Sequence, residues 1–383
     1  MIQDTIHEKF VERYGEHPQL FSAPGRINVI GEHTDYNDGF VLPAAINKRI
    51  YFALKKNDSG QCRIYAHDID EEYTFPADQK EPVKKTWVNY PLGVIREMMK
   101  IREFNLTGFD CIFGGDLPLG AGLSSSAALE TGFAHAINEI FEVGVEPAQI
   151  MHLSQNAEHN FAGMQCGIMD QFAAVYGKKG HVVKLDCRSL DSDYYPLHFK
   201  DYQLILCNSN VQHELASSEY NVRRKQCEEG VGIIKQNHPS VKNLRDVTFD
   251  MLEEHQDQMD EVVLDRCLYV LRENERVHDT CEKLQENDVD AIGRNLYLSH
   301  KGLSEMYEVS CDETDFLVDL TKDMEYVKGA RMMGGGFGGS TINLVKIDSM
   351  EEFEERLAKA YYDKFSIQAD FFEVETDDGI KSH

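Results

Sequence analysis

The sequence lacks a long apolar run, a cysteine-pair motif and any segment that reads as a linker. No stretch approaches the roughly 20 apolar residues of a membrane-spanning helix. The N-terminal segment MIQDTIHEKFVERYG has no apolar core of the signal-peptide type. The nine cysteines are widely spaced without a CxxC pair, which indicates free thiols in a reducing compartment and no zinc site or disulfide framework. We therefore expect a cytoplasmic protein without a membrane partner.

Basic residues are also scarce, because 39 Lys and Arg face 66 Asp and Glu for a net charge of -27. A nucleic-acid partner is excluded, since phosphate backbones demand a basic surface. An acidic protein that binds an anion must concentrate its positive elements locally, and a glycine-rich loop with a divalent metal does so. Arg26 is one candidate for such local charge.

The chain has 383 residues, of which 42% are hydrophobic and 10% aromatic. This length predicts two ordinary domains rather than one small core. The only tryptophan, Trp87, lies in a run, Thr86–Arg102, whose apolar residues predict a largely buried helix. We expect Trp87 to pack in the core, with contact to an adenine ring as the alternative.

The chain lacks the GxxxxGK[ST] motif, so any nucleotide must be held without a P-loop lysine. It has instead PLGAGLSSSAALE, Pro118–Glu130, between a predicted strand, Phe109–Phe113, and a run with helical spacing. Glycines allow close backbone approach, and serine hydroxyls beside a helix N-terminus suit a phosphate. The alternative is a glycine turn whose serine only caps the helix.

A second glycine run, GGGFGG at Gly334–Gly339, satisfies GxGxxG literally. In a dinucleotide fingerprint the glycines open a helix, whereas here a predicted strand, Thr341–Val345, follows at once. We reject the Rossmann interpretation. The run predicts a hairpin-like loop whose backbone approaches another loop or a ligand closely.

The polar cluster EHTD, Glu32–Asp35, follows a predicted strand. It suits a polyhydroxylated ligand such as a sugar, because carboxylates accept hydrogen bonds from hydroxyls and histidine can donate or accept. Two alternatives stay open. The cluster could bind a divalent metal, or Asp35 could be a turn residue.

Two further carboxylates stand out. Asp170 has apolar neighbours, and because an unpaired buried charge is costly we expect an arginine partner. Such a partner would keep Asp170 ionised and ready to accept or orient a hydroxyl proton. An exposed aspartate on an amphipathic helix is the alternative. Glu158 could meet the phosphate loop through magnesium, although a solvated helix face is the commoner fate of a glutamate.

Coarse patterns outline the remaining chain. They predict an N-terminal helix, a hairpin of Arg49–Lys56 and Cys62–His67 turned at Asn57–Gly60, and a second half richer in helix. A charged helix is predicted between Glu214 and Lys235.

The motifs resemble a known family. SAPGRINVIGEHTDYNDGFVLP, PLGAGLSSSAALE and GARMMGGGFGGSTINLV resemble the three motifs of the GHMP small-molecule kinases. Within the first, GRINVIGEHTDYNDG resembles the galactokinase signature, and AEHNFAGMQCGIMDQF and ASSEYNVRRKQCEE resemble further galactokinase stretches. The resemblance spans nearly the whole chain.

The resemblance implies transfer of the γ-phosphate of ATP, with Mg²⁺, to the C1 hydroxyl of α-D-galactose, the first phosphorylation step of galactose catabolism. At matching positions, Asp170 would be the catalytic base and Arg26 would stabilise the charge that develops during transfer. Sugar hydroxyls would be held by Glu32, His33, Thr34, Asp35, Gly167 and Tyr220. The ATP phosphates would lie on Gly120, Ala121, Gly122, Leu123, Ser124, Ser125 and Ser126. Ser126 and Glu158 would complete the coordination of magnesium.

The implied fold is α+β, with a ribosomal S5-like N-terminal domain over 1–166 and a ferredoxin-like C-terminal domain over 167–383. A monomer is expected. One alternative is a kinase for a neighbouring sugar such as N-acetylgalactosamine, against which Asn37-Asp38-Gly39 follows the galactokinase pattern. The other is a sensor that binds galactose and ATP without catalysis. Such paralogues lack a Ser-Ala pair that is present here.

Overall fold

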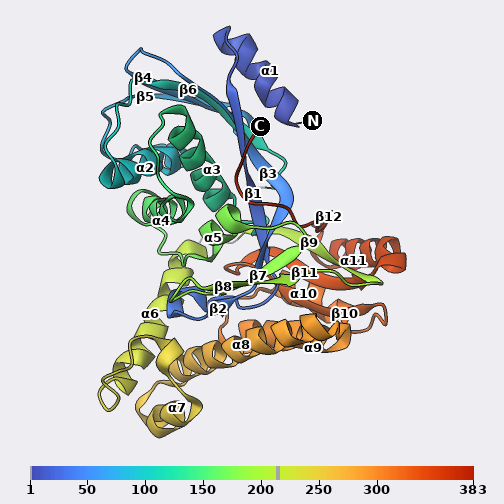
Figure 1. Cartoon of the computed structure of the whole chain (residues 1–383). Coiled ribbons are helices and arrows are strands. Elements are labelled where there is room, and N and C mark those ends of the chain that lie inside the picture. The colour runs from blue at the N-terminus through green and yellow to red at the C-terminus, as the bar shows by residue number, and fades with distance from the viewer. Residues whose placement is uncertain (1, 119, 213–215) are drawn as a thin grey trace.

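The computed structural model describes residues 2–118, 120–212 and 216–383 (Figure 1). Its first part is a six-stranded sheet in the order β13-β1-β3-β6-β4-β5. The strands are β1 (Gln19–Asn28), β3 (Pro43–Lys56), β4 (Gln61–Ala66), β5 (Glu71–Pro76), β6 (Phe109–Gly115) and β13 (Lys381–Ser382).

Helices cover both faces of this sheet because side chains alternate between the faces along each strand. Helix α1 (Ile2–Tyr14) packs Ile6 and Phe10 against Ala53 and Ile112. The opposite face, which includes Phe52, belongs to the main core under α2 (Thr86–Ile101), α3 (Ser125–Ile140) and α4 (Pro147–Ala157). The predicted N-terminal helix and the predicted helix around Trp87 are thereby confirmed. The predicted succession of a strand, the glycine loop and a helix is confirmed as well.

The predicted hairpin is wrong in its pairing. β3 and β4 exist, but β6 lies between them, antiparallel to β3 and parallel to β4. The Asn57 amide donates to the carbonyl of Gly108, which precedes β6. The turn residues predict a bend between β3 and β4, whereas the fully buried Phe109 and Cys111 of β6 take the central position in the sheet.

The second part of the chain has a four-stranded antiparallel sheet in the order β10-β11-β9-β12. Its strands are β9 (Tyr202–Gln212), β10 (Val327–Met332), β11 (Gly338–Lys346) and β12 (Asp370–Glu373). The helices are α6 (Ala216–Ile234), α7 (Phe249–His255), α8 (Glu261–Glu286), α9 (Val289–Lys301), α10 (Asp312–Thr321) and α11 (Met350–Phe365). The predicted charged helix is α6, and Glu214 lies outside the described residues. No helix within the described ranges is long and apolar enough to cross a bilayer.

Two features join the halves. A small sheet pairs β2 (Phe40–Val41) with β7 (His181–Asp186) and β8 (Ser192–Pro196). The C-terminal segment returns to the first sheet through β13, and the buried Arg49 guanidinium donates to the Asp377 carboxylate at 2.8 Å. The division into 1–166 and 167–383 stays a prediction.

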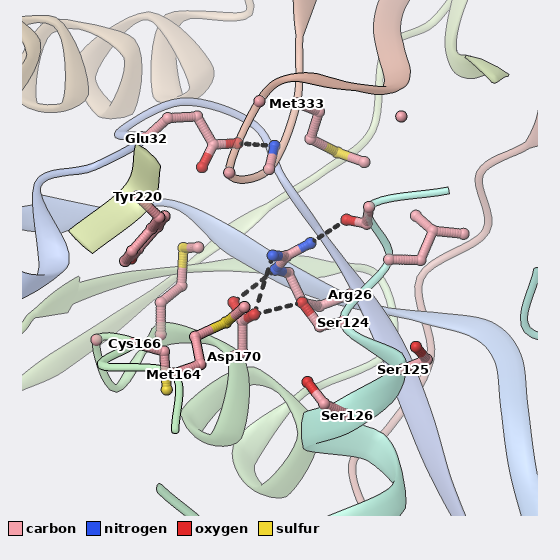
Figure 2. A pocket seen from close by; sticks show the side chains of 18 of the residues that line it. Arg26, Glu32, Ser124, Ser125, Ser126, Met164, Cys166, Asp170, Tyr220 and Met333 are labelled. Carbon is pink, nitrogen blue, oxygen red and sulfur yellow. Dashed lines mark hydrogen bonds and ion pairs between the residues drawn. The ribbon is translucent and has the colours of Figure 1, made fainter. Parts of the chain in front are cut away.

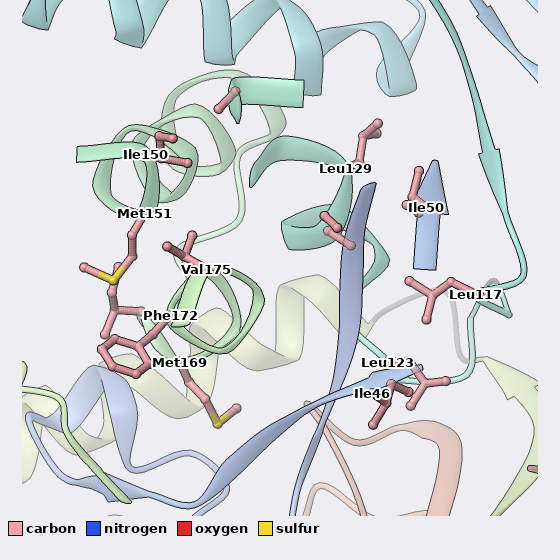
Figure 3. Packing of buried hydrophobic residues seen from close by; sticks show 14 of the residues in the cluster. Ile46, Ile50, Leu117, Leu123, Leu129, Ile150, Met151, Met169, Phe172 and Val175 are labelled. Atoms are coloured by element: carbon pink, nitrogen blue, oxygen red, sulfur yellow. The ribbon is translucent and has the colours of Figure 1, made fainter. Parts of the chain in front are cut away.

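Helix α5 (Met169–Tyr176) packs against α3, α4, β1 and β3. Its Met169, Phe172 and Val175 are buried in the main core, near Met151 of α4 (Figure 3). Asp170, in the first turn of α5, lines a pocket together with Met169. The apolar side of a short helix therefore fixes the position of this one carboxylate.

Trp87 packs against the main core as predicted. Its indole Nε1 donates to the Glu71 carboxylate at 2.6 Å, and its ring meets Phe113 edge-on at 5.8 Å between centroids. It does not line the pocket that holds Asp170.

Candidate active site

A pocket of about 300 Å³ lies where segments far apart in the chain converge (Figure 2). Most sequence-predicted site residues line it: Arg26, Glu32, His33, Asp35, Gly120, Gly122, Leu123, Ser124, Ser125, Ser126, Glu158, Gly167, Asp170 and Tyr220. The glycine run, Gly334–Gly339, forms another wall.

Asp170 has the arginine partner that its apolar surroundings predict. Arg26 of β1 donates to both Asp170 carboxylate oxygens, from Nε at 2.8 Å and from Nη2 at 3.1 Å. Its third nitrogen donates to the Gly122 carbonyl at 2.6 Å (Figure 2). The Arg26 side chain is 6% exposed and that of Asp170 is 25% exposed, so the carboxylate keeps access to the pocket. One arginine thus fixes both Asp170 and the predicted phosphate loop.

The N-terminus of α3 lies at the pocket and has no side-chain cap. Ser124 has a left-handed backbone with φ of 56° and makes no capping bond to the helix. Its hydroxyl donates to Asp170 Oδ2 at 2.5 Å instead. The first amides of any helix lack intrahelical partners, and here they open on the pocket beside Ser125 and Ser126. This geometry favours phosphate binding over the capping alternative.

The two glycine-rich loops lie against each other. Gly120 and Gly122 have φ of 75° and 73°, which a side chain would strain. Directly after the other loop, the hydroxyl of Ser340 in β11 donates to the Ala121 carbonyl at 2.7 Å. Strand β11 follows this loop directly, as predicted from the sequence, so the loop is no dinucleotide fingerprint.

Glu32 is held by a buried guanidinium. Arg331 of β10 pairs with Glu32 Oε1 at 3.0 Å, and the Gly334 amide donates to the same oxygen at 2.8 Å. Arg331 is fully buried, and its remaining donors bond main-chain carbonyls, including that of Val29 at 2.9 Å. Because the bonds of Oε1 are fixed in this way, Oε2 can face the pocket.

The ring nitrogens of His33 both have protein partners. Nε2 lies 3.2 Å from the Gly335 carbonyl, which can only accept, so Nε2 carries the proton. Nδ1 therefore accepts from the Tyr36 hydroxyl at 2.8 Å, and this hydroxyl accepts from that of Tyr307 at 2.8 Å. Burial lowers the pKa of His33 to about 3, which keeps the ring neutral. His33 ties the EHTD turn to the glycine run.

Asp35 sits at a close backbone approach. A Cβ atom on Gly167 would lie 1.9 Å from Asp35 Oδ2, so only glycine fits there. The Tyr36 amide donates to Asp35 Oδ1 at 3.0 Å. Burial, followed by the charge of Asp170, raises the pKa of Asp35 to about 7. Tyr220 of α6 lines the same side of the pocket.

Two sequence-predicted residues do not line the pocket. Thr34 is fully buried, and its hydroxyl donates to the carbonyls of Gly31 at 2.8 Å and Phe40 at 2.6 Å. It shapes the EHTD turn from within. Ala121 is also fully buried, and its carbonyl is engaged by Ser340.

Glu158, in the π-helical turn Glu158–Ala162 after α4, is buried at the pocket wall. Its carboxylate lies against the Ser126 hydroxyl, and the Gln171 amide donates to it at 2.9 Å. Burial, followed by the Asp170 charge, raises its pKa. Burial, followed by the Glu158 charge, raises the pKa of Glu130 well above the usual range.

Sequence reasoning missed Arg331 and gave no role to Glu130 or Cys166. An available signal for Arg331 was its place in the otherwise apolar strand GARMM. Glu130 likewise stands among apolar residues of a helix. The Cys166 thiol, which donates to Glu158 at 3.3 Å, carried no distinctive pattern.

Comparison with family models and curated proteins gives one consistent result. The galactokinase galactose-binding signature matches residues 8–56, the GHMP kinases N terminal domain matches 89–178, and the GHMP kinases C terminal matches 281–363. The galactokinase of Thermosipho africanus is 43% identical over 94% of this chain and 98% of its own. That of Roseiflexus sp. is 38% identical over 98% and 96%, respectively.

Comparison with solved structures points to the same family. The Lactococcus lactis galactokinase, complexed with galactose, superposes with a TM-score of 0.95 at 29% identity over the full length of both chains. The mevalonate kinase of Methanococcus jannaschii, at 16% identity over 95% of this chain and 99% of its own, has a TM-score of 0.66 and shares the fold. The predicted two-domain fold is thereby confirmed. With its three motifs gathered around one pocket, this chain belongs to the galactokinase family of the GHMP kinases.

Proposed function

We propose that this ATP-dependent sugar kinase transfers the γ-phosphoryl group of ATP to the C1 hydroxyl of α-D-galactose, giving α-D-galactose 1-phosphate and ADP. One observation carries the assignment of roles. The Arg26–Asp170 pair lies between the EHTD turn and an uncapped helix N-terminus, where an acceptor hydroxyl and a phosphate chain would meet. Family membership supports the reaction, and the Lactococcus lactis neighbour contains galactose.

Asp170 and Arg26 would act on the reacting atoms. The Asp170 carboxylate either removes the proton of the C1 hydroxyl early, or orients that hydroxyl by a hydrogen bond and takes the proton after the bond to phosphorus has largely formed. Arg26 fixes that carboxylate through two hydrogen bonds and places positive charge beside the oxygens of the transferring group. Phosphoryl transfer needs in-line positioning and charge neutralisation more than covalent help, so a rigid pair of this kind is sufficient.

The phosphate chain of ATP would lie on Gly120–Ser126. The free amides at the start of α3 and the hydroxyls of Ser125 and Ser126 supply donors, and the positive end of the helix dipole adds to them. No lysine lines this pocket within the described ranges. The positive charge that triphosphate requires must therefore come from Arg26 and from a metal ion.

Magnesium fits the residues present. Glu158 and Glu130 are buried, and no arginine or lysine of the described chain forms an ion pair with either. We assign Ser126 and Glu158 as the residues that would hold the ion, because magnesium takes one or two protein oxygens plus phosphate oxygens and water. The ion would neutralise charge on the β- and γ-phosphates.

The sugar would lie between Glu32, Asp35, the Gly167 backbone and Tyr220. Glu32 Oε2 and the Asp35 carboxylate would accept hydrogen bonds from sugar hydroxyls, and the absence of a Gly167 side chain lets the sugar approach the backbone. We assign His33 to the structure of this subsite rather than to the sugar, since both of its ring nitrogens are engaged.

The proposal is tested by ADP release from Mg-ATP with galactose, glucose, mannose, N-acetylgalactosamine or no sugar. We expect turnover with galactose only, and its loss in Asp170→Asn. Preference for N-acetylgalactosamine would make the chain a kinase of a neighbouring sugar. Galactose binding without turnover would identify a sensor. The nine free cysteines further support a reducing, cytoplasmic location.

A further inference from the structure

Helix α3 carries a glutamate that none of the roles above uses. Glu130 is fully buried, and neither of its carboxylate oxygens makes a hydrogen bond of normal geometry with a described residue, although the Gln171 and Glu158 side chains are its polar neighbours. A buried carboxylate in this state is costly unless an ion or a set of donors compensates it. A ligand that brings positive charge or hydrogen-bond donors would remove this cost.

The position of Glu130 points to the phosphate side of the pocket. Ser126 and Glu130 are four residues apart on α3, so they share a helix face with their Cβ atoms about 5–6 Å apart. The Glu130 carboxylate faces that of Glu158, which in turn lies against the Ser126 hydroxyl. Two carboxylates and a hydroxyl from separate helical segments thus gather behind the phosphate loop.

The surroundings are rich in acceptors and poor in cations. Gln171 directs Nε2 to Glu158, which leaves the buried Oε1 of Gln171 without a partner among the described residues. The buried Ser154 hydroxyl, one helical turn before Glu158, also lacks one there. The Arg26 guanidinium is already paired with Asp170. Oxygen acceptors without a cation are the surroundings that a hydrated divalent ion requires.

We infer that Glu130 is an outer-shell residue of the cation site, accepting hydrogen bonds from the water molecules that magnesium keeps when Ser126 and Glu158 hold it. This inference rests on the proposed function, which places the ion there. Magnesium gives up its water reluctantly, and the protons of that water need acceptors. Outer-shell partners of this kind orient a metal ligand and raise the affinity of its site.

The test is the affinity of the enzyme for Mn²⁺, measured by electron paramagnetic resonance with saturating ADP and no sugar, so that no turnover occurs. Glu130→Gln should weaken Mn²⁺ binding by about 10- to 100-fold, as loss of an outer-shell partner does. Glu130→Asp, which keeps the charge, should recover part of the affinity. The matched control is Glu139→Gln, which removes the same charge from an exposed position on α3 and should leave the affinity unchanged.

Mn²⁺ affinity within twofold of the wild type in folded Glu130→Gln would overturn the inference. Circular dichroism tests whether Glu130→Gln is folded. If it is not folded, the Glu130→Asp variant decides, and Mn²⁺ affinity equal to that of the wild type would overturn the inference. The two proposals fail separately. If the wild type turns over galactose but the variant has unchanged Mn²⁺ affinity, only the proposed role of Glu130 is refuted. If Mn²⁺ binding depends on Glu130 but galactose is not turned over, only the proposed sugar kinase activity is refuted.

Discussion

Arg331 and Glu32 form an ion pair of 3.0 Å in which the arginine side chain is 0% and the glutamate 2% exposed. They lie 299 residues apart in the chain, and the pair joins β10 to the segment that follows β1. The carboxylate that we propose binds the sugar is therefore oriented by the third motif.

Replacing Arg331 should harm galactose binding more than ATP binding. Arg331→Met leaves the Glu32 carboxylate buried without its partner, a loss that typically costs about 3–5 kcal/mol of folding stability. In variant protein that remains folded, KM for galactose should rise at least tenfold, whereas KM for ATP should change little. Steady-state kinetics measure both constants. Arg294→Met, at an exposed site on α9, is the control. Equal rises in both KM values of Arg331→Met would contradict the proposal that Arg331 orients Glu32 toward the sugar.

Adding one methyl group at Gly167 should disturb the sugar subsite. The Cβ would lie 1.9 Å from Asp35 Oδ2, so the Gly167→Ala variant must displace that carboxylate. We expect KM for galactose to rise about tenfold or more, the effect of roughly 1.4 kcal/mol. Gly232→Ala, where a Cβ meets nothing within 4 Å, should leave the kinetics unchanged. A Gly167→Ala enzyme with normal galactose KM would show that Asp35 does not bind the sugar.

Asp35 should make stability depend on pH. Its pKa of about 7 in the folded protein exceeds the usual 3.8, so its stabilising contribution is full below pH 4 and is lost as the pH rises to 7. Asp35→Asn removes this loss and should therefore raise Tm much more at pH 8 than at pH 5, where only the first part of the loss has occurred. The low pKa of His33 acts oppositely, but it is common to both proteins and cancels. Differential scanning calorimetry with exposed Asp58→Asn as control tests this, and equal shifts at both pH values would refute it.

His33 should act on the sugar only indirectly. His33→Phe keeps the ring between Tyr220 and Tyr307 but removes both hydrogen bonds of the imidazole. We expect a rise in KM that is the same for galactose and for its 2-deoxy, 4-deoxy and 6-deoxy analogues. If His33 bonded one sugar hydroxyl directly, the rise in KM caused by His33→Phe would instead disappear for the analogue that lacks this hydroxyl. This double-deletion comparison isolates a pairwise contact.

Asp170 should control the chemical step. Asp170→Asn keeps an acceptor for Arg26 but cannot take a proton, so kcat should fall by about 10²- to 10⁴-fold. Calorimetric titration should still detect binding of galactose to the variant. Near-normal kcat would remove Asp170 from the reaction.

Local patterns predicted the elements around the site because each depends on neighbours in the sequence. The glycines of the phosphate loop, the start of α3 and the need of Asp170 for an arginine are all of this kind. Pairing between distant segments could not be predicted in this way. The insertion of β6 between β3 and β4 and the return of β13 to β1 depend on which strands bury best together.

The same limit applies to the site residues. The EHTD letters do not show that both His33 nitrogens are occupied, because the partner of Nε2, Gly335, lies 302 residues away in the chain. The partners of Thr34, Gly31 and Phe40, are close in sequence, but the inward direction of its hydroxyl depends on the backbone conformation of the turn. Arg331 could be suspected from its apolar strand, but its partner, Glu32, lies at the other end of the chain.

The most direct measurement is the position of phosphate on the product. The enzyme is incubated with Mg-ATP and galactose labelled with ¹³C at C1, and the product is examined by phosphorus NMR. Our account predicts a single sugar phosphate whose phosphorus couples to the labelled carbon, formed by the wild type and almost absent with Asp170→Asn. A product without that coupling, or ADP formation that does not require galactose, would contradict it.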